Sequence, residues 1–318
     1  MVVKRWWGTI FLVGWAVALS VGCAAPKLGE NTLAVVNGRP ITRAEFDTRL
    51  KIFALFYGQP VDDPARKQQV LDQMVRDMLI REQAGPLGVA VADEEVEAEM
   101  ARFFGSLDRQ YKSREAVNGR LQELNLTNDA IAAFLREFLL SQKIVSRKRS
   151  EVTVAEDEMR TFYEQKQDEL YTFGEDVVRA AHILVPMDQE SKAQEIAAKA
   201  KAGGDFGELA RLYSVDPASN QQGGDLGYFT RENMVRELSD AAFTMDLGRT
   251  SDPVRSQYGW HIILVKDRQG PGVLPFEKAK DDVQSRLLIS KQEQAYQQWV
   301  SELERNAKIT KVSVTSLK

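Results

Sequence analysis

Two short runs decide the fold: residues 177–185 read VVRAAHILV, and residues 259–264 read GWHIIL. Each run sets one histidine, His182 or His261, beside aliphatic residues, and the chain has 2 histidines in all. Short apolar runs of this composition are typical of buried β-strands. The two runs therefore predict adjacent central strands, with the histidines close enough to share hydrogen bonds across them.

Helical and extended patterns alternate around these runs. The spacing predicts further helices and strands, namely helices over 191–202, 205–213 and 233–245 and strands over 251–254 and 260–266. A β-α-α-α-β-β order is typical of an α+β domain. The glycine-rich run GGDLG at 223–227 could be a phosphate-binding loop or a tight turn. Its aspartate would repel a phosphate group, so we expect a tight turn that exposes Leu226.

The part of the chain before this domain has helical spacing. Residues 42–149 predict four or five helices with almost no strand signal. Thr42 with Glu45 matches a capping box, the reciprocal side-chain and backbone pairing at a helix start. A second such pair, Thr153 with Glu156, predicts a charged connecting helix within residues 151–175.

A long helix follows the α+β domain. Pro275 stands where proline is favoured, at the first position of a helix that runs to about Arg305. Its apolar face carries Ala279, Val283, Leu287, Tyr296 and Val300. An amphipathic helix must bury such a face, so we expect residues 273–308 to pack on a helical module of residues 31–150. The α+β domain, residues 176–268, is then an insertion between the two.

The first residues have the pattern of an export signal. Lys4 and Arg5 precede an uncharged stretch that reaches Cys23, the single cysteine of the chain. Residues 19–23, LSVGC, resemble a lipobox, with Ser20 where leucine is usual. We therefore expect a signal peptide over 1–22, a lipid on Cys23 and a tether over 23–30. The alternatives are simple secretion, or an uncleaved anchor, since the uncharged stretch 6–26 has a membrane-spanning length.

Composition excludes several classes of function. Lys and Arg number 42 against 46 Asp and Glu, a net charge of −4, which gives no electrostatic reason to expect nucleic-acid binding. One cysteine excludes an intramolecular disulfide and a zinc thiolate cluster, and two histidines disfavour any metal site. From the residues alone, His182 and His261 have two interpretations, as structural core histidines or as catalytic groups.

Between residues 177 and 267, several motifs in order resemble parvulin-type peptidyl-prolyl cis-trans isomerases. They are HILV at 182–185, FGELA at 206–210, YSVD at 213–216, GGDLGYF at 223–229, AAF at 241–243 and YGWHII at 258–263. Residues 35–42, VVNGRPIT, resemble the N-terminal module of SurA-like and PrsA-like extracytoplasmic chaperones. The resemblance implies an α+β fold with a small antiparallel sheet, inserted between a helical chaperone module and the C-terminal helix.

The resemblance also assigns the site. It places His182, Asp216 and His261 at the active centre. Tyr258 stands where some relatives carry a small hydroxyl residue, and its own hydroxyl is expected to join the histidine network. The proline pocket would consist of the apolar residues Leu226, Phe229, Met234, Leu238 and Phe243, although an aromatic residue is common where this chain has Leu238. The loop over 186–190 is acidic, whereas relatives that select phosphorylated substrates carry basic residues there. The resemblance therefore implies an isomerase with no cofactor, no metal and no need for phosphate on its substrate.

These expectations define a biological role. The chain should be a membrane-tethered, extracytoplasmic isomerase and chaperone acting on unfolded or newly exported polypeptides with Xaa-Pro bonds. In a cell with an outer membrane, Ala24 after Cys23 predicts its periplasmic face, because aspartate there usually retains lipoproteins at the inner membrane. Aromatic residues of the helical module are candidates for a client-binding cradle, namely Phe53, Phe56, Tyr57, Phe103 and Phe104. The alternatives are a non-catalytic holdase whose parvulin domain only binds clients, and a factor dedicated to one secretion pathway.

Overall fold

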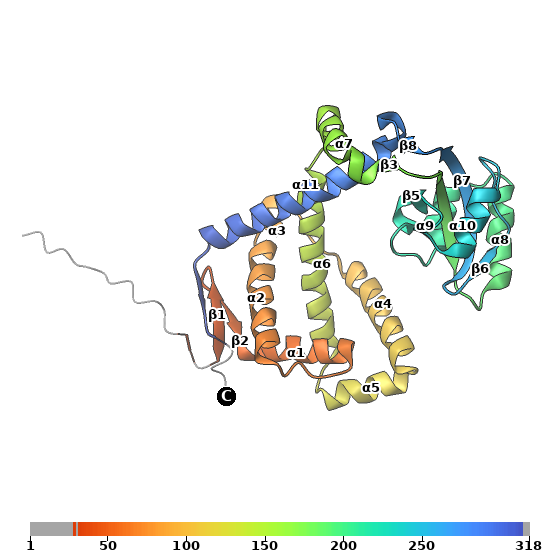
Figure 1. Ribbon diagram of the computed structural model, residues 1–318. Coiled ribbons are helices and arrows are strands. Elements are labelled where there is room, and N and C mark those ends of the chain that lie inside the picture. Colours follow the sequence, from red (N-terminus) through yellow and green to blue (C-terminus); the bar gives the residue numbers. More distant parts are fainter. Residues whose placement is uncertain (1–27, 30, 314–318) are drawn as a thin grey trace, which may run out of the picture. The chain divides into compact units, whose positions relative to one another are not determined.

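The computed structural model describes residues 28, 29 and 31–313 (Figure 1). The predicted signal peptide, the lipidation at Cys23, the alternative anchor and most of the tether therefore lie outside the described residues. The chain divides into two compact units. We call residues up to 149, with those from 296 onward, the helical unit, and residues 150–295 the α+β unit. Within the described ranges, no helix is both long and apolar enough to cross a membrane.

The helical unit opens on a small antiparallel sheet. Strands β1 (Thr32–Val36) and β2 (Arg39–Thr42) form a hairpin, and β9 (Ile309–Lys311) pairs with the other edge of β1. Asn37 and Gly38 both adopt positive φ in the turn, as their dipeptide predicts. The Asn37 side chain also accepts a hydrogen bond from the backbone amide of Lys308 at 2.8 Å. Strand β9 is not predicted from the sequence, because its partner β1 lies at the opposite end of the chain.

Helices make up most of the helical unit. They are α1 (Arg43–Tyr57), α2 (Pro64–Arg81), α3 (Ala84–Leu87), α4 (Asp93–Tyr111), α5 (Arg114–Glu123) and α6 (Asn128–Ser150). The predicted capping box of α1 is confirmed, because the Glu45 amide donates to the Thr42 hydroxyl and the Thr42 amide donates to the Glu45 carboxylate. One helix more than predicted is present, because the chain after α2 forms the single turn of α3 before Gly88 ends it.

Helix α11 (Phe276–Asn306) contributes to both units, and its apolar residues divide between them. Tyr296 and Val300 pack with residues of α2 and α6 in the helical unit. Ala279, Val283 and Leu287 instead pack in the α+β unit, against helix α7 (Glu156–Leu170). The expectation of one continuous stripe on the N-terminal module is therefore wrong for the first half of α11, because α7 has an apolar face of its own.

Helix α7 also begins later than predicted. Its N-cap is Ala155, whose amide donates to the carboxylate of Glu158 at 2.8 Å, and the pair Thr153 with Glu156 does not cap it. Val154 and Met159, the residues before the cap and at the fourth helical position, lie in the same apolar cluster. Such a hydrophobic staple fixes where a helix starts.

The α+β unit is built on a four-stranded antiparallel sheet of order β5-β4-β7-β6. Its strands are β4 (Val177–Val185), β5 (Asp225–Phe229), β6 (Val254–Ser256) and β7 (Gly259–Gln269), and a separate ribbon pairs β3 (Thr172–Phe173) with β8 (Gly272–Val273). The connection from β4 to β5 contains α8 (Glu190–Lys201), α9 (Phe206–Tyr213) and the short 3₁₀ helix η1 (Asn220–Gln222), and the connection from β5 to β6 contains α10 (Arg236–Thr244) (Figure 1). A turn at residues 257–258 joins β6 to β7.

Strand alternation determines which face carries the histidines. Side chains of a strand point alternately to the two faces of its sheet. One face packs Ile183 and Ile262 against α8 and α9, and the other packs Ala180 and Ile263 against α10. His182 pairs with Ile263, so the histidine of β4 lies on the α10 face. His261 pairs with Leu184 and therefore lies diagonally beside His182 on that same face.

The predicted turn over 223–227 is wrong for its last three residues, which begin the edge strand β5. The His182 amide donates to the Gly224 carbonyl at 2.8 Å, just before β5 begins. Gly224 has a φ of +77°, and a Cβ on it would lie 2.1 Å from the His182 carbonyl oxygen. Only glycine fits there, so the GGDLG motif reflects a close backbone approach to the histidine strand.

Candidate active site

The two histidines form a direct pair. Nδ1 of His182 lies 3.0 Å from Nδ1 of His261, and the rings stack with their centroids 5.2 Å apart. Both residues are buried, with 6% and 2% of their surfaces exposed. A buried imidazole requires partners for both ring nitrogens, so the remaining two nitrogens define the rest of the site.

Asp216 is the second partner of His182. Its Oδ2 atom lies 2.9 Å from Nε2 of His182, in the segment between α9 and η1. Oδ2 also accepts the Ser219 hydroxyl at 2.5 Å, and Oδ1 accepts the Ala218 amide at 3.2 Å. Burial raises the pKa of the Asp216 carboxyl, but these hydrogen bonds outweigh burial and hold that pKa below its ordinary value. Asp216 is therefore ionised at neutral pH.

Ser256 is the second partner of His261. Its hydroxyl lies 2.7 Å from Nε2 of the ring and accepts the backbone amide of Tyr258 at 3.1 Å. Burial, with a smaller contribution from the neighbouring His182, lowers the pKa of His261 to about 4. His261 is therefore neutral under ordinary conditions.

One arrangement of protons satisfies every partner in this network. The ionised Asp216 accepts from Nε2–H of His182, which makes Nδ1 of a neutral His182 an acceptor. His261 then donates through Nδ1–H, and its Nε2 accepts the Ser256 hydroxyl. With these tautomers assigned, the contacts form a continuous hydrogen-bond chain from Ser256 through both rings to Asp216. A chain of this kind fixes both ring orientations without requiring a charged imidazole.

The side chain of Tyr258 does not take part in this chain. Tyr258 is 60% exposed, and among the described residues its hydroxyl has no hydrogen-bond partner. The expectation that its hydroxyl joins the histidine network is therefore wrong, because Ser256, two residues earlier and in β6, faces His261 instead. Only the backbone of Tyr258 contributes.

The five predicted pocket residues gather in one apolar cluster on the α10 side of the sheet. Leu226, Met234 and Phe243 are partly exposed, whereas Phe229 and Leu238 are buried, Leu238 completely. The rings of Phe229 and Phe243 meet edge to face at 6.2 Å. Leu226, Met234 and Phe243 therefore offer accessible apolar surface on this side of the sheet, while Phe229 and Leu238 belong to its buried core.

Asp225 fixes the strand that carries Leu226. Its carboxylate binds Arg179 of β4 at 2.9 Å and Lys266 of β7 at 2.8 Å, and it accepts the Gly227 amide. Burial raises the pKa of Asp225, but these partners together keep it below its ordinary value. The aspartate of the GGDLG motif is thus a structural ion-pair partner that holds β5 on the sheet.

Sequence reasoning missed the serines of the site. Ser256 and Ser219 contact His261 and Asp216, and the Ser214 hydroxyl accepts the amide of Leu184 at 3.0 Å. Ser214 was visible within the YSVD motif, but serine is common and its spacing gave no signal for the other two. Over residues 28, 29 and 31–313, no three His, Cys, Asp or Glu side chains are grouped to hold a metal ion.

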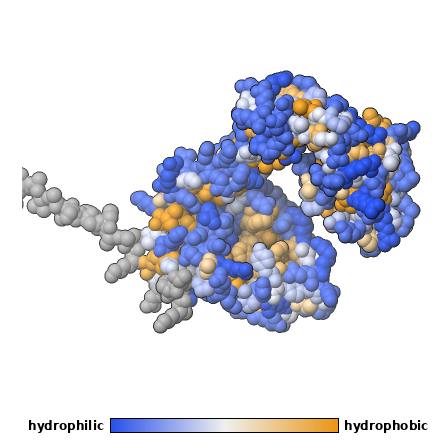
Figure 2. All heavy atoms as spheres, in the orientation of Figure 1, coloured by the Kyte–Doolittle hydropathy of each residue, from blue (hydrophilic) through white to orange (hydrophobic). Residues whose placement is uncertain are grey.

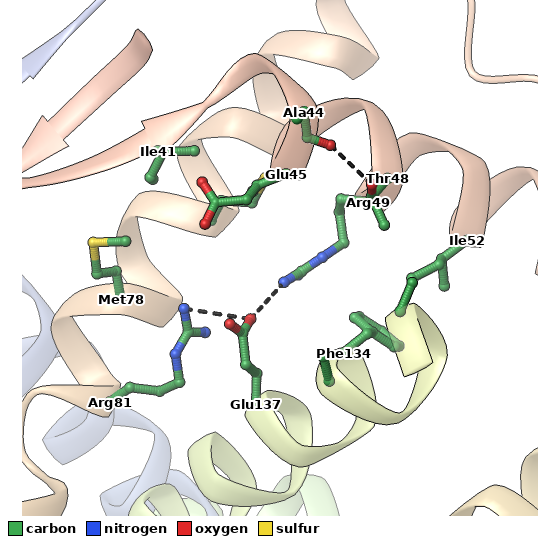
Figure 3. A pocket seen from close by; sticks show the side chains of 13 residues that line it. Ile41, Ala44, Glu45, Thr48, Arg49, Ile52, Met78, Arg81, Phe134 and Glu137 are labelled. Carbon is green, nitrogen blue, oxygen red and sulfur yellow. Dashed lines mark hydrogen bonds and ion pairs between the residues drawn. The ribbon is translucent and has the colours of Figure 1, made fainter. Parts of the chain in front are cut away.

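The helical unit has a pocket of its own between α1, α2 and α6, of about 290 Å³ (Figure 3). Arg49 and Arg81 both point toward the carboxylate of Glu137, at 3.2 and 3.5 Å, and Arg49 also meets Asp77 at 3.4 Å. The Glu45 carboxylate faces the same space. The charges of this pocket are therefore balanced within the protein.

The predicted aromatic cradle of the helical unit is only partly at the surface. Phe56 and Tyr57 are 49% and 66% exposed, whereas Phe104 is a core residue, and Phe53 and Phe103 are partly buried. Figure 2 shows apolar side chains interrupting the hydrophilic surface of this unit. Of the five predicted cradle residues, the two that are exposed, Phe56 and Tyr57, thus lie at the end of α1.

Two family models match the chain, the PPIC-type PPIase domain over residues 163–269 and the SurA-like N-terminal domain over residues 1–145. The foldase protein PrsA of Caldanaerobacter subterraneus subsp. tengcongensis is 32% identical over 311 residues, which cover 92% of this chain and 91% of that relative. PrsA of Halalkalibacterium halodurans is 30% identical over 283 residues, covering 88% and 77%. The crystal structure of PrsA from Bacillus subtilis matches 87% of this chain and 93% of that chain, at 25% identity and a TM-score of 0.48.

Proposed function

This chain belongs to the PrsA family of foldases, and from that premise we propose that it isomerises Xaa-Pro bonds at a site formed by His182, Asp216 and His261. The protein is an extracytoplasmic foldase with a PPIC-type isomerase domain. The observation that carries the assignment of the site is the continuous chain from Ser256 to Asp216. It lies on the sheet face that also carries the apolar cluster around Phe229.

The reaction is rotation about an amide bond and needs no bond to be broken. The barrier is about 18–20 kcal/mol, because conjugation keeps the amide planar. A site accelerates the rotation only by favouring the twisted amide over both planar isomers. Every ~1.36 kcal/mol of such preference gives a tenfold increase in rate.

The apolar residues hold the proline ring and exclude water. Leu226, Met234 and Phe243 offer partly exposed apolar surface for the ring, so that the residue before proline can rotate against it. Removing water from the carbonyl weakens the planar, charge-separated form of the amide. This contribution follows from desolvation and requires no cofactor.

Asp216 acts on the polarity of the same amide. The carbonyl oxygen is more negative in the planar form, so a fixed carboxylate nearby destabilises the planar form more than the twisted one. The hydrogen bonds from His182, Ser219 and Ala218 hold this carboxylate in place and ionised. The histidine pair positions Asp216 and forms the floor of the site.

The clients are unfolded or newly exported polypeptides that contain Xaa-Pro bonds, with no requirement for phosphate. The loop after β4 supports this, since it carries Asp188 and Glu190 and has no basic residue. Exposed Phe56 and Tyr57 support a chaperone role for the helical unit. The chain is held at the membrane by a lipid on Cys23, on the periplasmic face of the outer membrane where the cell has one. The lipobox-like run at 19–23 supports the lipid anchor.

Exchange spectroscopy by NMR tests the reaction with residues 24–318 and an unphosphorylated Ala-Xaa-Pro peptide. We expect the wild type to accelerate cis–trans exchange and the variant His182→Ala with Asp216→Ala to lose most of this effect. The matched control is Asp252→Ala, a carboxylate of the same unit whose side chain is 91% exposed. If the wild type fails with every Xaa tried, the assigned activity is wrong, and the remaining function is client binding without catalysis.

A further inference from the structure

A second groove of the helical unit, of about 800 Å³, lies along one face of α2. Its apolar floor and wall are Val70 of α2 with Phe53 and Tyr57 of α1. Tyr57 stacks edge to face on both Phe53 and Phe56, with ring centroids 6.3 and 5.3 Å apart. The groove therefore has a rigid aromatic side that is exposed to solvent.

Two arginines of α2, Arg66 and Arg76, line this groove, and no aspartate or glutamate is among its lining residues. Arg66 forms no ion pair with any described residue, and the guanidinium of Arg76 bonds only to the neutral amide of Gln73, at 3.0 Å. This differs from the pocket of Figure 3, where Glu137 balances both arginines. The lining of the groove thus carries two arginines and no carboxylate, and the carboxylate that Arg76 acts on electrostatically, Asp72, lies outside the lining and pairs with Lys311.

The spacing of the two arginines sets the length of a matching ligand. Residues 66, 70, 73 and 76 recur at helical spacing on one face of α2. Ten residues of helix separate Arg66 from Arg76, about 15 Å at 1.5 Å per residue. In an extended chain, residues four positions apart are about 13 Å apart and point to the same side, as does the residue midway between them.

We propose that this groove binds extended segments of unfolded chains in which two acidic residues, four positions apart, flank a central aromatic or aliphatic residue. The acidic side chains pair with Arg66 and Arg76, and the central side chain packs on Phe53, Tyr57 and Val70. This inference rests on the chaperone role proposed above and gives that role a client preference.

Three acetylated, amidated peptides test the preference against residues 24–318. The first is Gly-Glu-Ser-Phe-Ser-Glu-Gly, the second has Lys for both Glu, and the third, Gly-Ser-Glu-Phe-Glu-Ser-Gly, turns both acids away from the phenylalanine face. Dissociation constants come from fluorine NMR of a fluorinated phenylalanine. We expect the second peptide to bind at least tenfold more weakly than the first, and the third several-fold more weakly. Residues 24–318 lack Lys4 and Arg5, so their net charge is −6 where the full chain has −4, and non-specific attraction would favour the lysine peptide instead.

Charge reversal separates a specific groove from a damaged protein. The variant Arg66→Glu with Arg76→Glu should prefer the lysine peptide, whereas a preference caused by the added negative charge alone would appear in the control variant as well. The control variant Arg39→Glu with Arg109→Glu makes the same charge change at exposed positions of the same unit and should keep the wild-type order. Equal binding of the first two peptides, or an unchanged order after reversal at residues 66 and 76, would overturn the proposal.

Isomerisation by the wild type distinguishes this proposal from the one on the active site. If exchange of the proline peptide is accelerated and the acidic peptide shows no preference, only the groove is wrongly assigned. If the acidic peptide is preferred and exchange is not accelerated, only the isomerase assignment fails.

Discussion

Two serine hydroxyls terminate the polar chain through the histidine pair, Ser256 at His261 and Ser219 at Asp216. Ser219 is buried and donates one of the hydrogen bonds that keep the pKa of the Asp216 carboxyl low. Ser219 is therefore a positioning residue that acts through Asp216.

Replacing Ser219 by alanine should narrow the pH range of activity. Loss of the hydrogen bond raises the pKa of Asp216, so on acidification the isomerase should lose activity at a higher pH than the wild type. At neutral pH, where Asp216 is still ionised, the rate should fall only a few-fold, because the hydrogen bonds from His182 and Ala218 still hold the carboxylate in place. Rates from pH 4 to 7 and the ¹³C titration of the carboxyl measure both effects. Identical acid limbs in the two proteins would contradict the assigned role.

His261 should make the stability of the α+β unit depend on pH. Its pKa is about 4 in the folded chain against an ordinary 6.5, so the unfolded chain binds more protons between these values. The free energy of unfolding should therefore be constant above pH 6.5 and fall as the pH drops toward 4, by about 3 kcal/mol in all. Urea unfolding followed by Trp260 fluorescence, with Trp299 replaced by phenylalanine, measures it. His261→Phe should lose most of this pH dependence, and an equal slope in that variant would count against the argument.

At the scale of elements, the placement of β5 depends on two glycines with different surroundings. Gly224 and Gly227 both have positive φ, +77° and +68°, but only at Gly224 would a Cβ meet other atoms, at 2.1 Å from the His182 carbonyl oxygen. The two positions therefore separate the cost of backbone conformation from the cost of lost pairing between β5 and β4.

Alanine at each glycine should give different losses of stability. Gly227→Ala should cost about 1–2 kcal/mol, the strain of a left-handed conformation for a non-glycine residue. Gly224→Ala should cost clearly more and also slow isomerisation, because β5 and His182 must move apart. Urea unfolding and peptide exchange measure the two effects, and equal losses at both positions would show that the close approach does not matter.

These elements also show what the sequence can reveal. The histidine strands and the capping box at Thr42 were predictable because each depends on neighbours within a few residues. Strand β5 was missed because glycines, which the close approach requires, interrupt the strand pattern. Strand β9 was missed because its partner β1 lies at the far end of the chain. The hydroxyl that contacts His261 was assigned to Tyr258 and belongs to Ser256, because the pairing of β6 with β7 decides which side chain faces His261.

At the scale of the whole molecule, the mode of membrane attachment depends on one residue. If Cys23 carries the lipid, Cys23→Ser should abolish incorporation of labelled fatty acid and move the protein from the membrane to the soluble fraction. Two or more acyl chains suffice for stable anchoring, and the mature chain has no other cysteine to receive one. Fractionation in high salt measures the change. Continued membrane association of the serine variant would instead favour an uncleaved anchor over residues 6–26.

The pairing of β1 with β9 has a consequence for how the protein leaves the cell interior. Export threads the chain outward from its N-terminus, so residues 32–36 emerge long before their partners at 309–311. The α+β unit is one contiguous segment and can fold as soon as residue 295 has passed the membrane. The helical unit must wait for the last residues to arrive. In a foldase with this topology the isomerase domain folds first. During translocation the rest of the chain is still unfolded, as in the polypeptides on which foldases act.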